Sequence, residues 1–284
     1  MADPEIRSFQ ASDGYEHRYR FWATDGEPLA DVVALHGIQS HSGWYDYSSR
    51  CLAHAGFAVH FLDRRGSGLN ACQRGHTPGS KRLVQDVVEF LRFVCRTGPD
   101  APARDRRPLV LMAVSWGGRL AVVVAAEFPR LIDRLVLMYP GIRTKIDVST
   151  AEKLRILWAA VTGRFGRRVP IPLDEPALFT ADPDWQDFIR NDPLALHCVT
   201  VSFLLAHRKL SRLAERGIGR IRCPVLLMLA GRDRIVDNVA TRRLIERVPA
   251  DRRTVFEYPD AHHTLEFEPN REQIFSDLIQ WLRT

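Results

Sequence analysis

The sequence predicts an α/β fold in which a mainly parallel central sheet is flanked by helices. Three observations predict it: short apolar runs that end close to glycine, proline, serine or aspartate, segments of helical spacing between these runs, and one long stretch that breaks the alternation. A chain of 284 residues is long enough for one large domain of this class.

The first predicted element is an antiparallel hairpin. Residues Ile6–Gln10 and Arg18–Trp22 alternate weakly between apolar and polar side chains on either side of Asp13-Gly14. Such alternation is typical of a strand with one exposed face, so the hairpin is expected at an edge of the sheet.

Six continuous apolar runs follow the hairpin. Runs of this length without alternation are typical of strands that are buried on both faces. The predicted strands are Val32–Leu35, Phe57–Leu62, Leu109–Val114, Leu135–Met138, Val225–Leu229 and Thr254–Tyr258.

Helices are predicted in the segments that separate these runs. Apolar residues recur there at intervals of three and four, which is the period of one helix face. The predicted helices are Leu83–Val94, Leu120–Phe128, Val239–Val248 and Arg271–Leu282.

The stretch from about residue 144 to residue 216 contains no convincing buried strand. It combines helical spacing, for example at Leu154, Leu157 and Trp158, with prolines at positions 170, 172, 176, 183 and 193. We therefore predict a helical insertion that sits on the sheet domain.

The composition argues against several classes of protein. A formal net charge of +6 from scattered basic residues is weak evidence for nucleic-acid binding, and no recognition motif accompanies it. Five cysteines that are far apart predict reduced, mostly buried thiols rather than disulfides or a zinc site. The first residues lack the pattern of a secretory signal and no apolar run is long enough to cross a bilayer, so a cytoplasmic location is expected.

Ser115 is the first candidate catalytic residue. It lies between the predicted strand Leu109–Val114 and a helical pattern, where a nucleophilic serine sits on a sharp turn. Ala113, Gly117 and Gly118 supply the small neighbours that this turn needs, although alanine replaces the usual first glycine of Gly-x-Ser-x-Gly. An ordinary glycine-rich turn is the alternative.

Carboxylates and histidines follow the last two predicted strands. Asp233 lies just after the strand Val225–Leu229 and could orient an imidazole, whereas Asp237 is better placed to cap the next helix. His262 and His263 follow the strand Thr254–Tyr258, and chemistry alone does not choose between them as a general base.

The order serine, acid, histidine, with each residue just past a strand, is that of the α/β hydrolases. The chain resembles this superfamily, and more narrowly its monoacylglycerol lipase and lysophospholipase branch. That branch carries His-Gly-x-x-Glu-His-Ser-x-x-Tyr, and residues 36–45 here read His-Gly-Ile-Gln-Ser-His-Ser-Gly-Trp-Tyr. It also carries Asp-x-Arg-Gly-x-Gly-x-Ser, and residues 63–70 read Asp-Arg-Arg-Gly-Ser-Gly-Leu-Asn. The chain departs from these motifs at Ser40 and Asn70.

The resemblance implies an α/β-hydrolase fold with a catalytic triad of Ser115, Asp233 and His263. It assigns the base to His263, since Asp260-Ala261-His262-His263 is similar to a Gly-Ala-x-His segment of the branch. It also implies an oxyanion hole made by the backbone N–H groups of Ile38 and Trp116.

The expected activity is that of a serine ester hydrolase which cleaves carboxylic esters through an acyl-enzyme. Its substrate would be a small or lipid-like ester. No metal and no organic cofactor are expected, because the chemistry needs none and the histidines and cysteines show no convincing ligand spacing.

The resemblance further implies that residues 142–217 form a cap, or lid, on a hydrolase core of residues 1–141 and 218–284. The apolar candidates for lining an acyl pocket are Leu157, Trp158, Phe179, Trp185 and Phe203. Packing within the cap is the alternative for each of them. The cap's apolar residues and scattered arginines also raise the question of a peripheral membrane contact, and no oligomeric state is predicted.

Two other hypotheses stay open. The same triad could hydrolyse a carbon–carbon bond, a lactone or an amide, because a fold does not fix the substrate. Dehalogenase and epoxide hydrolase chemistry is disfavoured, since those relatives place aspartate at the nucleophile position. A protein that only binds a ligand is supported solely by Ala113 and the departures at Ser40 and Asn70.

Overall fold

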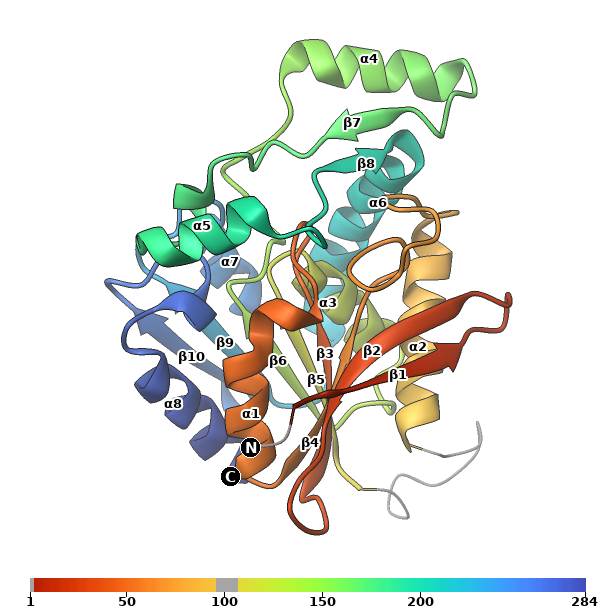
Figure 1. Cartoon of the computed structure of the whole chain (residues 1–284). Helices are drawn as coiled ribbons and strands as arrows, with labels where there is room; N and C mark the ends of the chain where they lie inside the picture. The colour runs from red at the N-terminus through yellow and green to blue at the C-terminus, as the bar shows by residue number, and fades with distance from the viewer. Residues whose placement is uncertain (1–2, 96–106) are drawn as a thin grey trace.

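A sheet of eight strands forms the centre of the computed structural model, which describes residues 3–95 and 107–284 (Figure 1). The strands lie in the order β1-β2-β4-β3-β5-β6-β9-β10. Their bounds are β1 (Glu5–Gln10), β2 (Glu16–Trp22), β3 (Ala30–Leu35), β4 (Phe57–Leu62), β5 (Leu109–Val114), β6 (Arg134–Met138), β9 (Val225–Ala230) and β10 (Arg253–Tyr258). Residues 1–2 and 96–106 of the predicted core lie outside this description.

The strand directions confirm the predicted fold class. β2 pairs antiparallel with β1 and with β4, so the hairpin lies at one edge, as expected. All other neighbouring strands of the sheet pair in parallel. The hairpin and the six predicted strands are all present, with ends that differ by at most two residues from those expected.

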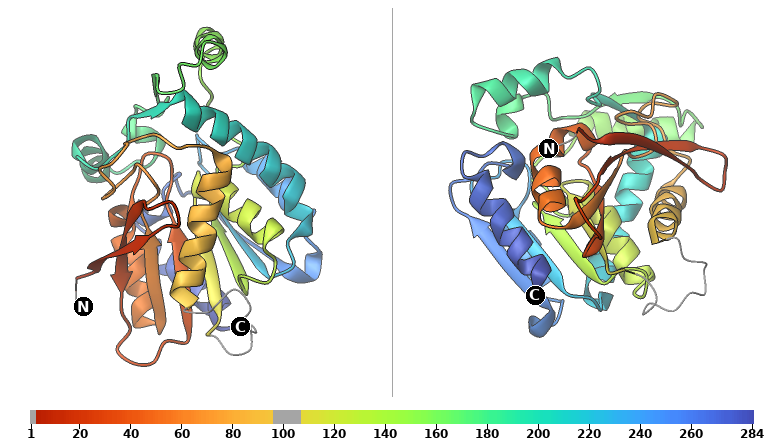
Figure 2. Two further views of the ribbon diagram at one scale, coloured as in Figure 1. Left: turned by 90° about the vertical axis from the view of Figure 1, so that its right-hand side faces the viewer. Right: turned by 60° about the horizontal axis from the view of Figure 1, so that its bottom comes forward.

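Helices cover both faces of the sheet, as Figure 2 shows. The helices beside the core are α1 (Asp46–His54), α2 (Ser80–Cys95), α3 (Gly117–Glu127), α7 (Asn238–Ile245) and α8 (Arg271–Arg283). Residues of α1 and α8 share one buried apolar cluster, and residues of α2, α3 and α7 share the other. α1 was not predicted, because Leu52 is the only large aliphatic residue among its nine.

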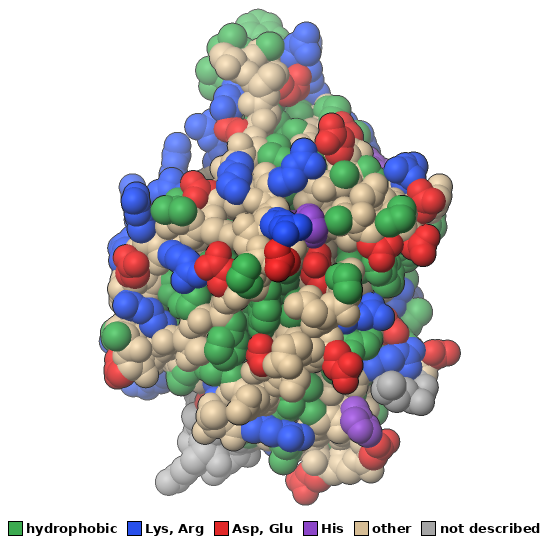
Figure 3. All heavy atoms as spheres, turned by 90° about the vertical axis from the view of Figure 1, so that its left-hand side faces the viewer, with side chains coloured by type: hydrophobic (Ala, Val, Ile, Leu, Met, Phe, Trp, Pro, Cys, Tyr) green, Lys and Arg blue, Asp and Glu red, His purple; other side chains and the backbone are tan. Residues whose placement is uncertain are grey.

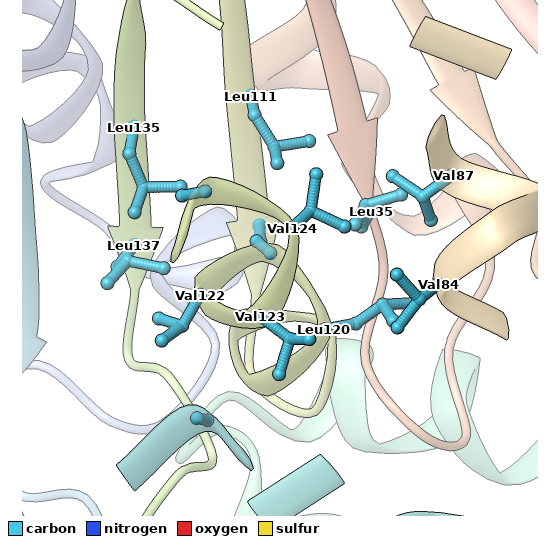
Figure 4. Packing of buried hydrophobic residues seen from close by; sticks show 14 of the residues in the cluster. Leu35, Val84, Val87, Leu111, Leu120, Val122, Val123, Val124, Leu135 and Leu137 are labelled. Carbon is cyan, nitrogen blue, oxygen red and sulfur yellow. The ribbon is translucent and has the colours of Figure 1, made fainter. Parts of the chain in front are cut away.

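The apolar strands supply both clusters by alternation. In β5, Leu109, Leu111 and Ala113 belong to the cluster around α3, whereas Val110, Met112 and Val114 belong to the opposite one. Figure 4 shows Leu111, Leu135 and Leu137 beside the apolar side chains of α3. Successive strand residues point to opposite faces, so a sheet covered on both sides needs an unbroken apolar run.

The segment between β6 and β9 lies above the carboxyl ends of the central strands (Figure 1). Its elements are α4 (Thr150–Val161), β7 (Arg168–Pro170), α5 (Pro183–Asn191), β8 (Cys198–Thr200) and α6 (Val201–Gly217). Short 3-10 helices span Ser42–Tyr45, Pro176–Leu178, Ile218–Arg220, Ala250–Arg252 and Leu265–Phe267. The segment is mainly helical, as expected, but the antiparallel pair β7–β8 was not predicted, since three residues are too short to establish a pattern.

α4 exposes several large apolar side chains. Leu154, Leu157, Trp158 and Val161 are each at least 60% exposed, and the helix is held mainly through Ile156 and Ala159. Figure 3 shows hydrophobic and basic side chains together at this tip of the molecule.

The described helices and cysteines test two further expectations. None of the described helices has the length and apolar character needed to cross a bilayer. None of the five cysteines, all of which lie among the described residues, forms a disulfide, but only Cys223 is buried and Cys72 is exposed. The prediction of mostly buried thiols was therefore wrong, because isolated cysteines carry no periodic signal that places them in the core.

Candidate active site

Ser115 lies on a strained turn between β5 and α3. Its backbone φ is 48°, a left-handed conformation that is uncommon for residues other than glycine. The turn is fixed by backbone hydrogen bonds, because the Ser115 carbonyl accepts from Gly118 N at 3.0 Å and from Gly141 N at 2.7 Å. A strained turn of this kind holds a serine side chain clear of the sheet.

Close backbone approaches explain the small residues around the turn. A Cβ added to Gly117 would lie 2.9 Å from the carbonyl oxygens of Leu35 and His36, and one added to Gly118 would lie 2.5 Å from Pro140 Cβ. Ala113 is fully buried in β5, so its methyl group fits this site. The alanine at the first position of the motif therefore leaves the geometry of the turn in place.

Ser115, His263 and Asp233 form one chain of hydrogen bonds. His263 Nε2 lies 3.0 Å from Ser115 Oγ, and His263 Nδ1 lies 2.8 Å from Asp233 Oδ2. Asp233 Oδ1 accepts from the N–H groups of Ile235 and Val236 at 2.7 and 2.8 Å. With hydrogen on Nδ1, the imidazole can accept the serine proton while the carboxylate stabilises the resulting positive charge.

The two alternatives to these residues have other partners. His262 bonds through its N–H and Nδ1 to Glu268 Oε1, at 2.9 and 3.2 Å. Asp237 is the N-cap of α7 and accepts from Ala240 N, as predicted. The geometry thus favours Asp233 and His263 over their sequence neighbours.

Two aromatic rings hold the His263 imidazole in place. Tyr139 lies edge-on to it, with ring centroids 4.8 Å apart, and Phe179 packs against it at 5.8 Å. The carbonyl of Phe179 also accepts from Thr264 N at 2.9 Å. Phe179 precedes α5, so the segment above the sheet contacts the general-base candidate directly.

Ile38 and Trp116 carry the backbone N–H groups expected in an oxyanion hole. Within residues 3–95 and 107–284, neither group donates to a protein acceptor. Both residues line the same cavity as Ser115. Unbonded N–H groups beside a nucleophile can stabilise a tetrahedral oxyanion.

The loop that carries Ile38 is fixed by residues of both sequence motifs. Ser40 Oγ accepts from Gly37 N at 3.0 Å, which shows what the serine does in place of the branch's glutamate. Arg64 bridges two carbonyls of the loop, donating to Gly37 O and Ile38 O at 3.0 Å each. His36 Nε2 accepts from Arg64 N at 2.9 Å, and burial, together with the Arg64 charge, lowers the pKa of His36 well below its usual value. His36 is therefore a neutral loop-shaping residue.

A cavity of about 550 Å³ lies beside Ser115, between the core and the segment above it. One part of its wall is apolar and includes Ile38, Ile142, Ile156, Ile171, Leu173 and Leu204. The cavity is large enough for a small organic ester.

The five predicted lining residues lie outside this cavity. Leu157 and Trp158 are each 60% exposed on α4. Phe203 stacks on Trp116 at 5.1 Å, and Trp185 stacks on Phe267 at 4.4 Å. Phe179 packs against His263 instead. The sequence indicated apolar residues in this segment but not the direction in which each one faces.

Sequence analysis missed two polar residues of the cavity wall, Arg119 and His207. Arg119 is buried in the first turn of α3, and its signal was a charge at the start of a helix that is then apolar as far as Glu127. His207 accepts from Trp116 Nε1 at 3.0 Å, and no sequence pattern indicated this contact. Across the described ranges, no group of three or more metal-ligating side chains occurs.

The chain matches one protein-family model and is similar in sequence to several known lipases. The family model described as serine aminopeptidase, S33, matches residues 26–270. A monoacylglycerol lipase of Mycolicibacterium smegmatis is 23% identical over 97% of this chain and 95% of its own length. A monoglyceride lipase of Rattus norvegicus is 25% identical over 90% of this chain and 82% of its own length.

Solved structures of similar fold include two lipases. The monoacylglycerol lipase of Paleococcus ferrophilus superposes with a TM-score of 0.80 at 25% identity, covering 94% of this chain and 98% of that one. A monoglyceride lipase of Saccharomyces cerevisiae, solved with a substrate analogue, has a TM-score of 0.84 at 20% identity, covering 99% and 96%. These likenesses confirm the α/β-hydrolase fold.

Proposed function

The chain belongs to the serine aminopeptidase, S33, family of α/β hydrolases and is a carboxylic ester hydrolase of the lipase type, and we propose that it cleaves monoacylglycerol-like esters by a Ser-His-Asp triad. The observation that carries the proposal is the hydrogen-bonded chain Asp233–His263–Ser115, which opens onto the cavity.

In the first half-reaction, Ser115 Oγ attacks the ester carbonyl. His263 Nε2 takes the serine proton, and Asp233 stabilises the imidazolium. The N–H groups of Ile38 and Trp116 hold the oxyanion of the tetrahedral intermediate. The C–O bond to the alcohol then breaks, and His263 returns its proton to the leaving alcohol. This step leaves an acyl group on Ser115.

Water completes the reaction. His263 takes one proton from the water as its oxygen attacks the acyl carbon, and the same two N–H groups hold the second oxyanion. When the ester bond to Ser115 breaks, His263 protonates the serine oxygen and the carboxylic acid leaves. No residue other than the triad needs to gain or lose a proton.

The proposal includes the predicted division of the chain. Residues 142–217 would act as a cap over the core of residues 1–141 and 218–284. The cavity between α3 and α6 supports this division, as does the contact of Phe179 with His263. We also propose a cytoplasmic location, which is supported by five cysteines that form no disulfide among the described residues, because thiols persist in a reducing compartment.

The test is hydrolysis of p-nitrophenyl esters of increasing acyl length, followed by release of glycerol from monoacylglycerols. Ser115→Ala should lower kcat by at least about a thousandfold, whereas Ser276→Ala, an exposed serine on α8, should match the parent protein. Failure of the folded parent to hydrolyse any ester would overturn the proposal. Activity on amides or lactones alone would move it to another reaction of the same triad.

A further inference from the structure

The cavity beside Ser115 has an excess of positive charge. The charged residues on its wall are Arg119, Arg143, Lys153, Arg208 and Arg212, against Asp147 and Glu215. Both acids are already paired: Asp147 lies 2.6 Å from Lys153, and Glu215 lies 3.1 Å from Arg143. In the part of the chain that the structure describes, the other three arginines form no ion pair with a carboxylate.

Arg119 is the buried member of this set. Its exposed fraction is 3%, and it donates to Ser211 Oγ at 3.0 Å and to the Gly141 carbonyl. Its Nη1 also lies 2.8 and 2.7 Å from the two ring nitrogens of His207, which is a neutral partner. Its Nε is a buried donor without a hydrogen-bond partner.

Burial lowers the pKa of Arg119 to about 9 against the opposing effect of the Glu215 charge, so the guanidinium still carries its charge at neutral pH. The Glu215 carboxylate acts on Arg119 but is itself paired with Arg143, so it offsets only part of the free-energy cost of burying this cation. An anionic ligand would offset more of that cost.

His207 beside Arg119 does not supply the missing counter-charge. Its Nδ1 accepts the Trp116 indole N–H at 3.0 Å, which requires that nitrogen to be unprotonated. Burial, and then the Arg119 charge, lower the pKa of His207 well below its usual value. This part of the wall therefore has a net charge from Arg119 alone.

Arg208 and Arg212 continue the positive wall along α6. They lie four residues apart and so share one face of the helix, and both are exposed. Arg119 lies on α3 one helical turn after Ser115, so the positive wall begins roughly 6 Å from the nucleophile along the helix axis. An anionic group at the far end of a bound ester could therefore reach these arginines while its carbonyl lies at Ser115.

We propose that Arg119, Arg208 and Arg212 form a binding site for an anionic oxygen group, and that the enzyme acts best on esters that end in a carboxylate or a phosphate. The apolar wall would hold the carbon chain between the reacting carbonyl and this group. The inference rests on the proposed esterase function for its substrate, but the binding site is testable without catalysis.

The kinetic test compares matched esters. The pairs are p-nitrophenyl pentanoate with mono-p-nitrophenyl glutarate, and the hexanoate and octanoate with the monoesters of adipate and suberate. In each pair a terminal methyl becomes a carboxylate. We expect kcat/KM for the best anionic ester to exceed that of its neutral partner by about tenfold, since ionic hydrogen bonds are the strong ones. A second pair, octanoylglycerol and octanoylglycerol phosphate, places the anion on the alcohol and so distinguishes the two origins of the charge.

Variants assign the effect to the arginines. Arg208→Gln/Arg212→Gln should lower the anionic-to-neutral ratio of kcat/KM by about tenfold. The matched control is Lys209→Gln/Arg216→Gln, which removes the same charge from α6 at residues that do not line the cavity. Arg119→Lys should retain more of the ratio than Arg119→Met. If the Arg119 variants fail to fold, Arg208→Gln/Arg212→Gln still tests whether the arginines cause the preference for anionic esters.

Calorimetric binding to Ser115→Ala separates this inference from the proposed function. Octyl phosphate should bind at least about tenfold more tightly than octanol, and the arginine double variant should lose the difference. Hydrolysis of neutral esters without any preference for anionic ones, or phosphate binding unaffected by the variants, would overturn the inference and leave the esterase function standing. Arginine-dependent binding of octyl phosphate, without hydrolysis of any ester, would support the anion site and overturn the esterase function.

Discussion

His262 and His263 are neighbours in sequence with different partners in space. His263 bonds to Ser115 and Asp233, whereas His262 bonds to Glu268. The strained turn fixes the position of Ser115, and two backbone N–H groups fix the carboxylate of Asp233. These contacts place His263, and not His262, where it can accept the proton of the Ser115 hydroxyl.

Substitution of the two histidines tests this assignment. His263→Ala should reduce kcat by at least about a thousandfold, because no other base lies within hydrogen-bond reach of Ser115 Oγ among the described residues. His262→Ala should keep most of the activity. Steady-state kinetics on one ester, with both variants checked for folding by circular dichroism, provides the measurement. The opposite ranking would assign the base to His262.

The Asp192 carboxylate, at the C-terminal end of α5, connects this helix to the core. Asp192 Oδ2 lies 3.0 Å from His41 Nε2 and accepts from Trp44 Nε1 at 2.6 Å. Burial opposes ionisation of Asp192, but the hydrogen bonds from His41 and Trp44 hold its pKa below the usual value. This carboxylate therefore positions the segment that presents Phe179 to His263.

Asp192→Asn should loosen α5 from the core. Replacing the carboxylate with an amide weakens its hydrogen bonds to His41 and Trp44, which should cost about 1–3 kcal/mol and appear as faster hydrogen exchange in α5. Asp187→Asn on the exposed side of α5 is the control, since exposed ion pairs contribute little. Equal protection of α5 in both variants would show that Asp192 does not hold this element.

The buried strands of the sheet could be predicted from the sequence, but the packing of the helices above it could not. The apolar runs predicted β3 to β6, β9 and β10, because a strand buried on both faces leaves a continuous apolar pattern. Ser115 and Asp233 could be singled out, because each lies just past such a run. The pattern left His262 and His263 open, and only the resemblance to the hydrolase branch favoured His263.

The cavity wall could not be predicted, because the directions of Phe203 and Trp185 depend on how α6 and α5 pack on the core, and this packing leaves no periodic pattern in the sequence. β7 and β8 are too short to leave any pattern.

In the whole molecule, one buried carboxyl group makes the stability of the folded protein depend on pH. Glu266 is buried, accepts from Ser48 N at 2.9 Å, and burial raises its pKa to about 7. Between the usual glutamate pKa and this value, the folded state holds a proton that the unfolded state has lost. This group therefore makes the protein less stable as the pH rises through that range.

Glu266→Gln should remove this pH dependence. The free energy of unfolding of the parent protein, relative to that of the variant, should fall by about 2 kcal/mol between pH 5 and pH 8. Urea unfolding of both proteins at the two pH values measures the difference. A constant difference, or one that grows in favour of the parent, would contradict the raised pKa.

Covalent labelling shows whether Ser115 is a nucleophile that His263 activates. Intact-protein mass spectrometry after treatment with a fluorophosphonate should show one added phosphonyl group per chain, with peptide mapping on Ser115. Ser115→Ala should not be labelled, and His263→Ala should be labelled far more slowly than His262→Ala. Labelling that persists in folded Ser115→Ala, or no labelling of the folded parent, would contradict the account.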